Sequence, residues 1–300
     1  MTLLVIGSVA FDTIETPVAK RENILGGSVP FFAYAASFFG PVQMVGVVGN
    51  DWSEEYTEMF RKQGIDCSGL EIVPDGKTFR WSGKYHENMN DRDTLETQLN
   101  VLGHFQPKLP DNFRRAQYVF LANGEPSTGL VVLDQIQGAD LVVADTMNFW
   151  INTTRNDLDA LLKRIDGLVL NDSEAKMLTG ELNTITAAKK ILNLGPKFVV
   201  VKKGEHGALF VSEYETYLIP AFPTENVVDP TGAGDSFAGG MMGYIASQGN
   251  LDSGTIKNAL VYGTLVASFC VEGFSLDRYK EINRTEIDQR LALFRKMASF

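Results

Sequence analysis

The sequence predicts an α/β protein with a doubly wound, mostly parallel sheet and helices on both faces of that sheet. Of its 300 residues, 44% are hydrophobic and 21% are charged, so the chain can bury a large core. Short apolar runs recur without strict alternation, which is typical of parallel strands buried on both faces. Helical patterns separate most of these runs, and this alternation of strand and helix indicates βαβ units.

The expected elements follow one another along the chain, and helices dominate after residue 235. The expected core strands are Leu3–Gly7, Val42–Val48, Tyr118–Leu121, Leu141–Ala144, Leu168–Leu170, Phe198–Val201 and Ala208–Val211. The expected helices are Pro30–Phe39, Glu54–Gln63, Thr128–Gln137, Leu158–Lys163, Ala187–Leu192, Ser236–Ser247, Thr255–Cys270 and Glu286–Ala298. No internal repeat or low-complexity linker divides the sequence, so we expect residues 1–300 to form a single domain with one appended lid.

One segment breaks this rhythm and predicts a small β-sheet that projects from the core. The alternation from Thr78 to Tyr85 is typical of a half-exposed antiparallel strand, and Thr94–Leu102 is expected to be a second strand. We interpret residues 74–103, together with 11–16, as a lid; the alternative is an edge hairpin of the main sheet. The aromatic side chains on one face of the first lid strand are Phe79, Trp81 and Tyr85. Because such a stripe is costly to leave in water, it either covers a substrate or pairs with a second copy, and we expect a homodimer through the lids.

Charge and cysteine usage exclude several classes of protein. The chain has 27 Lys and Arg against 37 Asp and Glu, a net charge of −10, so we expect no nucleic-acid partner. Two distant cysteines and three histidines provide neither a disulfide framework nor a zinc cluster. No secretory signal is evident, and the apolar stretch Val29–Phe39 is about half the ~20 residues of a membrane span. We therefore expect a soluble, cytoplasmic protein that does not associate with membranes.

The strongest local signal is the segment Asp229–Asp235, which leads directly into an expected helix. Gly232, Ala233 and Gly234 lack bulk, so their N–H groups can approach an anion, which the following helix N-terminus also favours. Asp235 has two interpretations. It is a structural helix cap, or it is a carboxylate that takes a proton from a hydroxyl attacking a phosphoryl group. The spacing leaves both interpretations open.

Three weaker segments each have a functional and a structural interpretation. Gly26–Pro30 allows close backbone approach before a helix, or is a plain loop-to-helix junction. Asn171–Glu174 follows a strand at its carboxyl end, where open α/β sheets bind ligands, or is a helix cap with an acidic first turn. Lys202–Gly207 lies between two strands, and alone it favours a turn with solvated lysines. The sequence contains neither a Walker-type P-loop nor the G-x-G-x-x-G of dinucleotide-binding proteins.

Taken together, and in this order over nearly the whole chain, these segments resemble the ribokinase-like (PfkB) carbohydrate and nucleoside kinases. The resemblance implies a doubly wound core, a β lid over the substrate, and ATP-dependent transfer of a phosphoryl group to a primary hydroxyl. It implies ATP and Mg²⁺ as cofactors and a sugar or a nucleoside as the substrate. The segment Asp229–Asp235 is the most specific part of the match.

The resemblance also implies roles for individual residues on the nucleotide side of the site. Asp235 is the expected catalytic base, and Gly232, Ala233 and Gly234 form the expected anion hole. Asn171 and Glu174 match the pair that orders Mg²⁺ and the phosphates from the outer shell. The expected nucleotide-binding residues are Asn171, Glu174, Lys202, Lys203, Gly204 and Gly207. Many members carry Thr where Lys202 stands, so a lysine there could supply a point charge in place of a hydroxyl.

A K⁺ site beside the anion hole is implied as well. Many relatives form it with residues that correspond to Asp229 and Thr231 and with backbone carbonyls of a later loop. We expect that loop at Ser268–Ser275.

On the acceptor side, Asp12 matches the carboxylate that commonly binds two substrate hydroxyls; the alternative is a residue that ends a strand in a turn. The expected neighbours of Asp12 around the acceptor are Gly26, Gly27, Ser28 and Trp81. In ribokinases the Gly-Gly segment continues with a run whose Asn helps to bind the sugar, and Ser28–Phe31 replaces that run here. We expect a sugar kinase, with a nucleoside kinase, adenosine first, as the alternative. A catalytically silent ligand-binding relative is the non-enzymatic alternative, against which the intact Asp235 argues.

Overall fold

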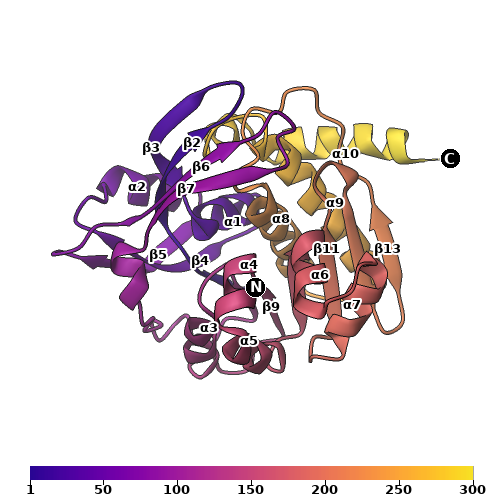
Figure 1. Cartoon of the computed structure of the whole chain (residues 1–300), viewed down its shortest axis with the longest axis horizontal. Coiled ribbons are helices and arrows are strands. Elements are labelled where there is room, and N and C mark those ends of the chain that lie inside the picture. Colours follow the sequence, from indigo (N-terminus) through magenta and orange to yellow (C-terminus); the bar gives the residue numbers. More distant parts are fainter. Residues whose placement is uncertain (300) are drawn as a thin grey trace.

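The computed structural model describes residues 1–299, and its core is one mostly parallel sheet between two layers of helices (Figure 1). In these residues the strand order is β13-β12-β11-β10-β9-β8-β1-β4-β5, with β12 and β13 antiparallel to their neighbours. The strands are β1 (Leu3–Ile6), β4 (Val42–Gly49), β5 (Ile65–Val73), β8 (Tyr118–Leu121), β9 (Leu141–Asp145), β10 (Gly167–Asn171), β11 (Phe198–Lys202), β12 (Ala208–Ser212) and β13 (Thr216–Ile219). The doubly wound fold predicted from the sequence is confirmed.

Each face of the sheet packs against its own set of helices, because successive crossovers pass on both sides. One face carries α1 (Ser28–Ser37), α2 (Glu54–Lys62), α8 (Ala233–Gln248), α9 (Ser253–Cys270) and α10 (Arg284–Ala298). The other carries α3 (Pro126–Leu133), α4 (Asn148–Thr153), α5 (Arg155–Leu162), α6 (Asp172–Thr179) and α7 (Thr184–Leu192). Glycines on α8 let it pack closely between α1 and α9: a Cβ at Gly239 would lie 2.4 Å from the Phe32 carbonyl oxygen, and one at Gly240 3.1 Å from Gly263 Cα. This packing holds α8, and with it the N-terminal turn of the helix, in a fixed position against α1 and α9.

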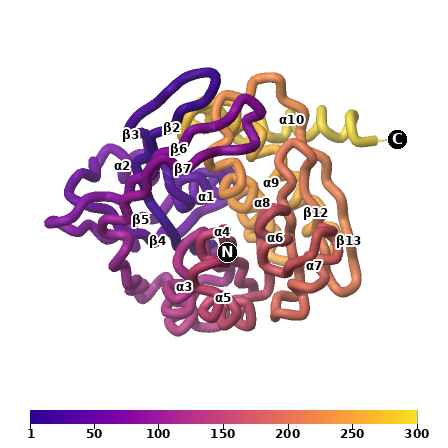
Figure 2. The backbone as a smooth tube through the Cα atoms, in the orientation of Figure 1, coloured from indigo at the N-terminus to yellow at the C-terminus, as the bar shows by residue number. Residues whose placement is uncertain are grey.

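The lid is a separate sheet with the strand order β3-β2-β6-β7, so the alternative of an edge hairpin of the main sheet is wrong. Its strands are β2 (Ala10–Glu15), β3 (Lys20–Gly26), β6 (Phe79–Tyr85) and β7 (Arg92–Gln98). Strands far apart in the sequence, β2 and β6, run side by side in it (Figure 2). The bounds predicted for the second strand, Thr94–Leu102, are wrong, since β7 starts at Arg92 and ends at Gln98. The strand ends early because Asn100 adopts a left-handed backbone (φ 49°) and opens a short 3₁₀ helix, Asn100–His104.

Three strands and two helices were missed from the sequence, and most of them carry little apolar signal. Lid strand β3 begins with four exposed polar residues, and β5 and β13 are edge strands with many exposed positions. Helices α4 and α6 are short, at six and eight residues. In the part of the chain that the structure describes, no helix is both long enough and apolar enough to span a bilayer.

Candidate active site

The candidate site lies at the carboxyl edge of the sheet, where the ends of three adjacent strands face the start of α8. Asp145 ends β9, Asn171 ends β10 and Lys202 ends β11. The Lys202 ammonium and the Asp145 carboxylate form an ion pair, with 2.9 Å between Nζ and Oδ2. Both side chains are largely withdrawn from water, since 18% of Lys202 and 6% of Asp145 is exposed. The strand ends therefore place fixed charges next to the glycine segment.

The glycine segment forms a tight turn that opens α8. Gly232 holds a left-handed backbone (φ 77°), and a Cβ there would lie 2.3 Å from the Phe31 ring, so this position requires glycine. The N-cap of α8 is Gly232, and no side chain makes a capping hydrogen bond to it. The interpretation of Asp235 as the helix cap is therefore wrong. The Ala233 N–H donates to the Pro230 carbonyl oxygen at 3.1 Å, so an anion at the first turn of α8 would be bound by its other N–H groups.

The carboxyl groups of the site have raised pKa values. Burial and the nearby Asp145 carboxylate raise the pKa of Asp235 to about 7, although Lys202 and the lid residue Arg92 act in the opposite direction. The pKa of Glu174 is raised to about 7 for the same first two reasons. A carboxyl group that titrates near neutral pH is suited to general acid–base catalysis.

Asn171 and Glu174 together cap α6. The Asn171 carboxamide accepts from the Glu174 N–H, and Glu174 Oε2 accepts from the Asn171 N–H, each at 2.8 Å. The helix-cap interpretation of this pair is thus confirmed. The role of the same two residues toward Mg²⁺ stays a prediction.

On the acceptor side, Asp12 lies inside lid strand β2 and is 4% exposed, so the alternative of a strand-ending turn residue is wrong. Burial and the Asp229 carboxylate raise its pKa to about 8. Its carboxylate fills the space beside Gly26, where a Cβ would come within 1.9 Å of Oδ2. Trp81 pairs with Asp12 across β2 and β6, so both side chains lie on the same face of the lid.

The start of α1 closes this part of the site. The Ser28 N–H donates to the Ser8 hydroxyl at 3.1 Å and the Ser8 N–H donates to the Ser28 hydroxyl at 3.2 Å. Gly27 caps α1 with a left-handed backbone (φ 88°), and a Cβ there would lie 2.6 Å from the Ser8 carbonyl oxygen. The structure therefore brings Asp12, Gly26, Gly27 and Ser28 together.

The segment Lys202–Gly207 connects β11 to β12 and includes a short 3₁₀ turn, Gly204–His206. The Lys203 N–H donates to the Gly207 carbonyl oxygen at 2.8 Å, which closes the loop. The Asn90 carboxamide, at the tip of the β6–β7 hairpin, donates to the Glu205 carboxylate at 3.2 Å. The lid thus reaches the loop that is expected to hold the nucleotide.

Asp229 and the later loop meet as expected from the sequence. Asp229 is fully buried; its Oδ1 accepts from the Thr231 N–H, and among residues 1–299 its Oδ2 has no partner. The Val228 and Asp229 N–H groups both donate to the Val271 carbonyl oxygen, at 2.7 and 3.3 Å. Burial raises the pKa of Asp229 to about 6. An unpartnered buried carboxylate oxygen is a position that a cation can occupy.

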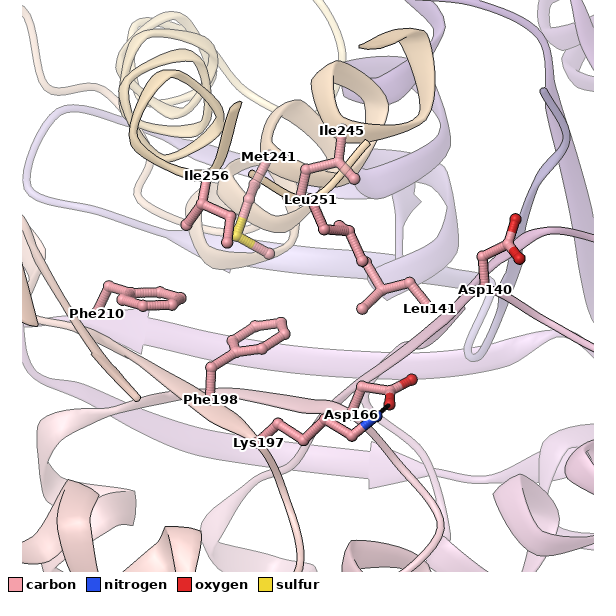
Figure 3. A pocket seen from close by; sticks show the side chains of 10 residues that line it. All are labelled: Asp140, Leu141, Asp166, Lys197, Phe198, Phe210, Met241, Ile245, Leu251 and Ile256. Carbon is pink, nitrogen blue, oxygen red and sulfur yellow. Dashed lines mark hydrogen bonds and ion pairs between the residues drawn. The ribbon is translucent and has the colours of Figure 1, made fainter. Parts of the chain in front are cut away.

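A distinct apolar cavity of about 130 Å³ lies at the opposite edge of the sheet (Figure 3). Phe198 and Leu141, the first residues of β11 and β9, line it together with Met241 and Ile256. None of the residues predicted from the sequence to form the site lines it, so it is not part of the candidate active site.

Comparison with known proteins agrees with this geometry. Residues 3–279 match the sequence family described as pfkB family carbohydrate kinase. The chain belongs to the PfkB family. As a PfkB-family chain it is an ATP-dependent kinase with an alcohol group as acceptor, and the membership predicted from the sequence is confirmed.

Relatives within the PfkB family act on different acceptors. A cytidine kinase from Thermococcus kodakarensis is 31% identical over 251 residues, 81% of this chain and 88% of the relative. The fold matches a Burkholderia thailandensis nucleoside kinase in complex with ADP-inosine, with a TM-score of 0.81, 19% identity, and coverage of 99% of this chain and 96% of that one. It also matches a putative ribokinase II from E. coli in complex with ATP and Mg²⁺, with a TM-score of 0.79, 19% identity, and coverage of 97% and 99%.

Sequence reasoning missed several residues of this PfkB-family site. Asp145 directly follows the expected strand Leu141–Ala144, and its place at a strand's carboxyl end was the available signal. Asn90 and Arg92 lie in the polar hairpin of the lid, where no pattern distinguishes them from solvated residues. Tyr85 was expected on the exposed aromatic stripe, yet it is 5% exposed and packs with Ile14 and Phe274. The chain's own residues thus cover much of that stripe, which removes the argument that it must pair with a second copy.

Proposed function

We propose that the chain transfers the terminal phosphoryl group of ATP to the primary hydroxyl of a nucleoside. The observation that carries the kinase chemistry is the Asp235 carboxylate in the first turn of α8, with its pKa raised to about 7 beside the turn Gly232–Gly234, which no side chain caps. A base whose pKa lies near the working pH can both take up and release a proton.

In the proposed reaction, Asp235 accepts the proton of the acceptor hydroxyl as the hydroxyl oxygen attacks the terminal phosphorus of ATP, and the bond from that phosphorus to the bridging oxygen breaks to release ADP. The N–H groups of the turn and the positive end of α8 stabilise the negative charge that develops on the phosphoryl oxygens. Asp12 binds the vicinal hydroxyls of the ribose, which orients the primary hydroxyl. The lid excludes water, so that the phosphoryl group is transferred and not hydrolysed.

Mg²⁺ is part of the proposal, and Glu174 fits an outer-shell role. In the described residues only Oε2 of Glu174 takes part in the capping box, so Oε1 is available to a metal-bound water. When bound, Mg²⁺ neutralises charge on the phosphates. Glu174→Gln should raise the Mg²⁺ concentration needed for half activity; an unchanged requirement would exclude this role.

The choice of a nucleoside over a sugar rests on three observations. The similarity to a cytidine kinase extends over 81% of this chain, and a nucleoside kinase from Methanothermobacter thermautotrophicus is 27% identical over 90% of it. Trp81 shares the lid face of Asp12, and an aromatic ring can stack on a base. The Asn that helps ribokinases to bind their sugar is missing. These observations favour the nucleoside alternative over the sugar kinase expected from the sequence. Cytidine replaces adenosine as the nucleoside that we expect first, because of the similarity to a cytidine kinase.

A coupled assay for ADP formation with cytidine, adenosine, inosine, uridine, ribose and fructose tests this choice. We expect turnover with at least one nucleoside and much weaker turnover with both free sugars. The same panel run by thermal shift measures binding, because a ligand at a hundred times its dissociation constant stabilises the fold by ~2.7 kcal/mol. Turnover of a free sugar with none of any nucleoside would overturn the nucleoside assignment.

A homodimer through the lids is also proposed, on a basis different from the aromatic stripe. Strand β7 forms an edge of the lid sheet, and all of its residues are exposed, Leu95 among them at 59%. An exposed edge strand offers unpaired N–H and C=O groups to a second strand. Light scattering at micromolar concentration tests this, and a monomer would exclude it; Leu95→Lys should shift a dimer toward monomer.

A further inference from the structure

We propose that Lys202 is a catalytic residue whose ammonium group stabilises the phosphoryl group in transit at the turn of α8, and that Asp145 is the residue that positions this ammonium. The proposal goes beyond the nucleotide-binding role expected for Lys202. It rests on the phosphoryl-transfer part of the proposed function, and it does not depend on which acceptor is used.

Two strand ends fix the position of the ammonium. Lys202 ends β11 and Asp145 ends β9, with β10 between them, and their side chains meet across the end of β10 at 2.9 Å. Removing two charges from water is costly unless they are held in close contact. Because both side chains are largely buried, the contact holds the ammonium in one place before any ligand binds.

The ammonium lies directly against the turn that opens α8. A Cβ atom at Gly234 would lie 2.9 Å from Nζ of Lys202, so glycine at this position makes room for the ammonium. An ammonium has three N–H donors, and Asp145 is the one acceptor bonded to it within residues 1–299. Two donors are therefore left for a ligand, at the place where backbone N–H groups and the helix dipole already favour an anion.

The surrounding charges increase the effect of this cation. The carboxyl groups of Asp145, Glu174 and Asp235 all raise the pKa of the Lys202 ammonium, which keeps it charged. The ammonium in turn lowers the pKa of Glu174 and of Asp235, against the effect of burial. Three carboxyl groups would repel a phosphoryl group that enters the site. A cation held at the turn offsets this repulsion where negative charge develops, in a site of low dielectric constant.

The test separates stabilisation of the transition state from binding of the nucleotide. Lys202→Met should lower kcat about 100-fold, the size of effect seen when one preorganised donor is removed from such a site. Its affinity for ADP should change less than about 3-fold, whereas its affinity for ADP with aluminium fluoride, a mimic of the phosphoryl group in transit, should fall in step with kcat. Lys202→Arg should recover part of the loss.

Asp145 is tested through Lys202. Asp145→Asn should lower kcat about 10-fold in the wild-type background and have little further effect in the Lys202→Met background. Both comparisons are made at pH 9, because Asp145 also raises the pKa of Asp235 and at this pH Asp235 is ionised with or without the Asp145 carboxylate. The double variant removes both buried charges at once, so it should be less destabilised than either single variant, each of which leaves one charge unpaired. Lys197→Met is the matched control, since it breaks the Lys197–Asp166 ion pair of 2.7 Å at the opposite edge of the same strands.

Three results would overturn the proposal. An unchanged kcat with a raised KM for ATP would make Lys202 a nucleotide-binding residue only. Equal losses of ADP and ADP–aluminium fluoride affinity would have the same meaning. If the losses of kcat in the two single variants add fully in the double variant, Asp145 does not act through Lys202 and has only a structural role. If the wild-type protein phosphorylates a sugar and no nucleoside, the acceptor assignment is wrong. The role of Lys202 is then tested by the same measurements with that sugar.

Discussion

The Thr231 hydroxyl donates a hydrogen bond to the Tyr85 hydroxyl at 3.1 Å, and this bond joins the lid to the turn that opens α8. Tyr85 ends β6 and is held in place by Ile14 and Phe274, whereas Thr231 directly precedes Gly232. The Asn90–Glu205 contact joins the tip of the same hairpin to the loop between β11 and β12. The lid is therefore linked to the phosphoryl-binding turn and to the expected nucleotide loop at the same time.

Tyr85→Phe should loosen lid closure without disturbing the fold. The ring keeps its packing, and the lost hydrogen bond, with a net contribution of about 0.5–1.5 kcal/mol, should raise the KM for the acceptor about 2- to 10-fold. ATP hydrolysis without acceptor should increase, since water enters a looser site. Tyr118→Phe, which removes a hydroxyl from the first residue of β8, is the control. An unchanged KM with unchanged ATP hydrolysis would show that the bond plays no part in closure.

Asp235→Asn should abolish most turnover while leaving the fold intact. General-base catalysis is worth about 10²- to 10⁴-fold, and the Asn side chain cannot take up the proton. The Tm should not fall, because Asp235 makes no capping bond that the substitution would remove, and above pH 7 it should rise, because the variant no longer buries an ionised carboxyl group. Asp252→Asn, at the start of α9, serves as the control for loss of a carboxylate near a helix N-terminus. A variant that keeps more than about a tenth of the wild-type kcat would refute the assignment.

Gly26→Ala should displace the Asp12 carboxylate, because the new Cβ would lie 1.9 Å from Oδ2. We expect the KM for the acceptor to rise about 10- to 100-fold, which corresponds to losing charge-assisted hydrogen bonds of about 1.5–3 kcal/mol. The KM for ATP should stay within a factor of about 2. In Gly40→Ala, the matched control, the new Cβ meets no atom within 4 Å. An unaltered acceptor KM would mean that Asp12 does not bind the acceptor.

The stability of the ligand-free protein should fall as the pH rises from 6 to 9. The pKa values of Asp12, Asp235 and Glu174 are raised to about 8, 7 and 7, well above the values of the unfolded chain. The folded state therefore binds more protons than the unfolded state over this window, and its stability is lost as the groups ionise. Asp12→Asn should flatten the dependence of Tm on pH, whereas Asp157→Asn, at an exposed position of α5, should not. A Tm that rises from pH 6 to pH 9 would contradict this prediction.

A monovalent cation should raise the rate if Asp229 holds it. We expect the rate in K⁺ to exceed the rates in Na⁺ and in N-methylglucamine at equal ionic strength, because carboxylate and carbonyl oxygens suit a weakly hydrated cation. Asp229→Asn should remove the difference between the three salts. Identical wild-type rates in all three salts would exclude the site.

The core fold and the glycine turn could be predicted from the sequence because their signals are local. The buried strands are continuous apolar runs, and Asp229–Asp235 carries its chemistry in consecutive residues. The Lys202–Asp145 pair could not be predicted, since it joins residues 57 positions apart and depends on strand order. The alternation of the sequence predicted which residues share a face of the strand that Tyr85 ends. It could not predict that Tyr85 is buried, because that depends on packing against Ile14 and Phe274 from other parts of the chain.

The central position of β1 has a consequence for the chain while it is being synthesised. Strand β1 emerges first, yet its two neighbours, β4 and β8, begin only at residues 42 and 118. Until residue 121 has left the ribosome, one edge of a fully apolar strand remains unpaired, and such edges promote association between nascent chains. The lid strand β2 likewise waits for β6 at residue 79. The first strands of this chain therefore depend, during translation, on protection that later segments supply only once β6 and β8, ending at Tyr85 and Leu121, have been made.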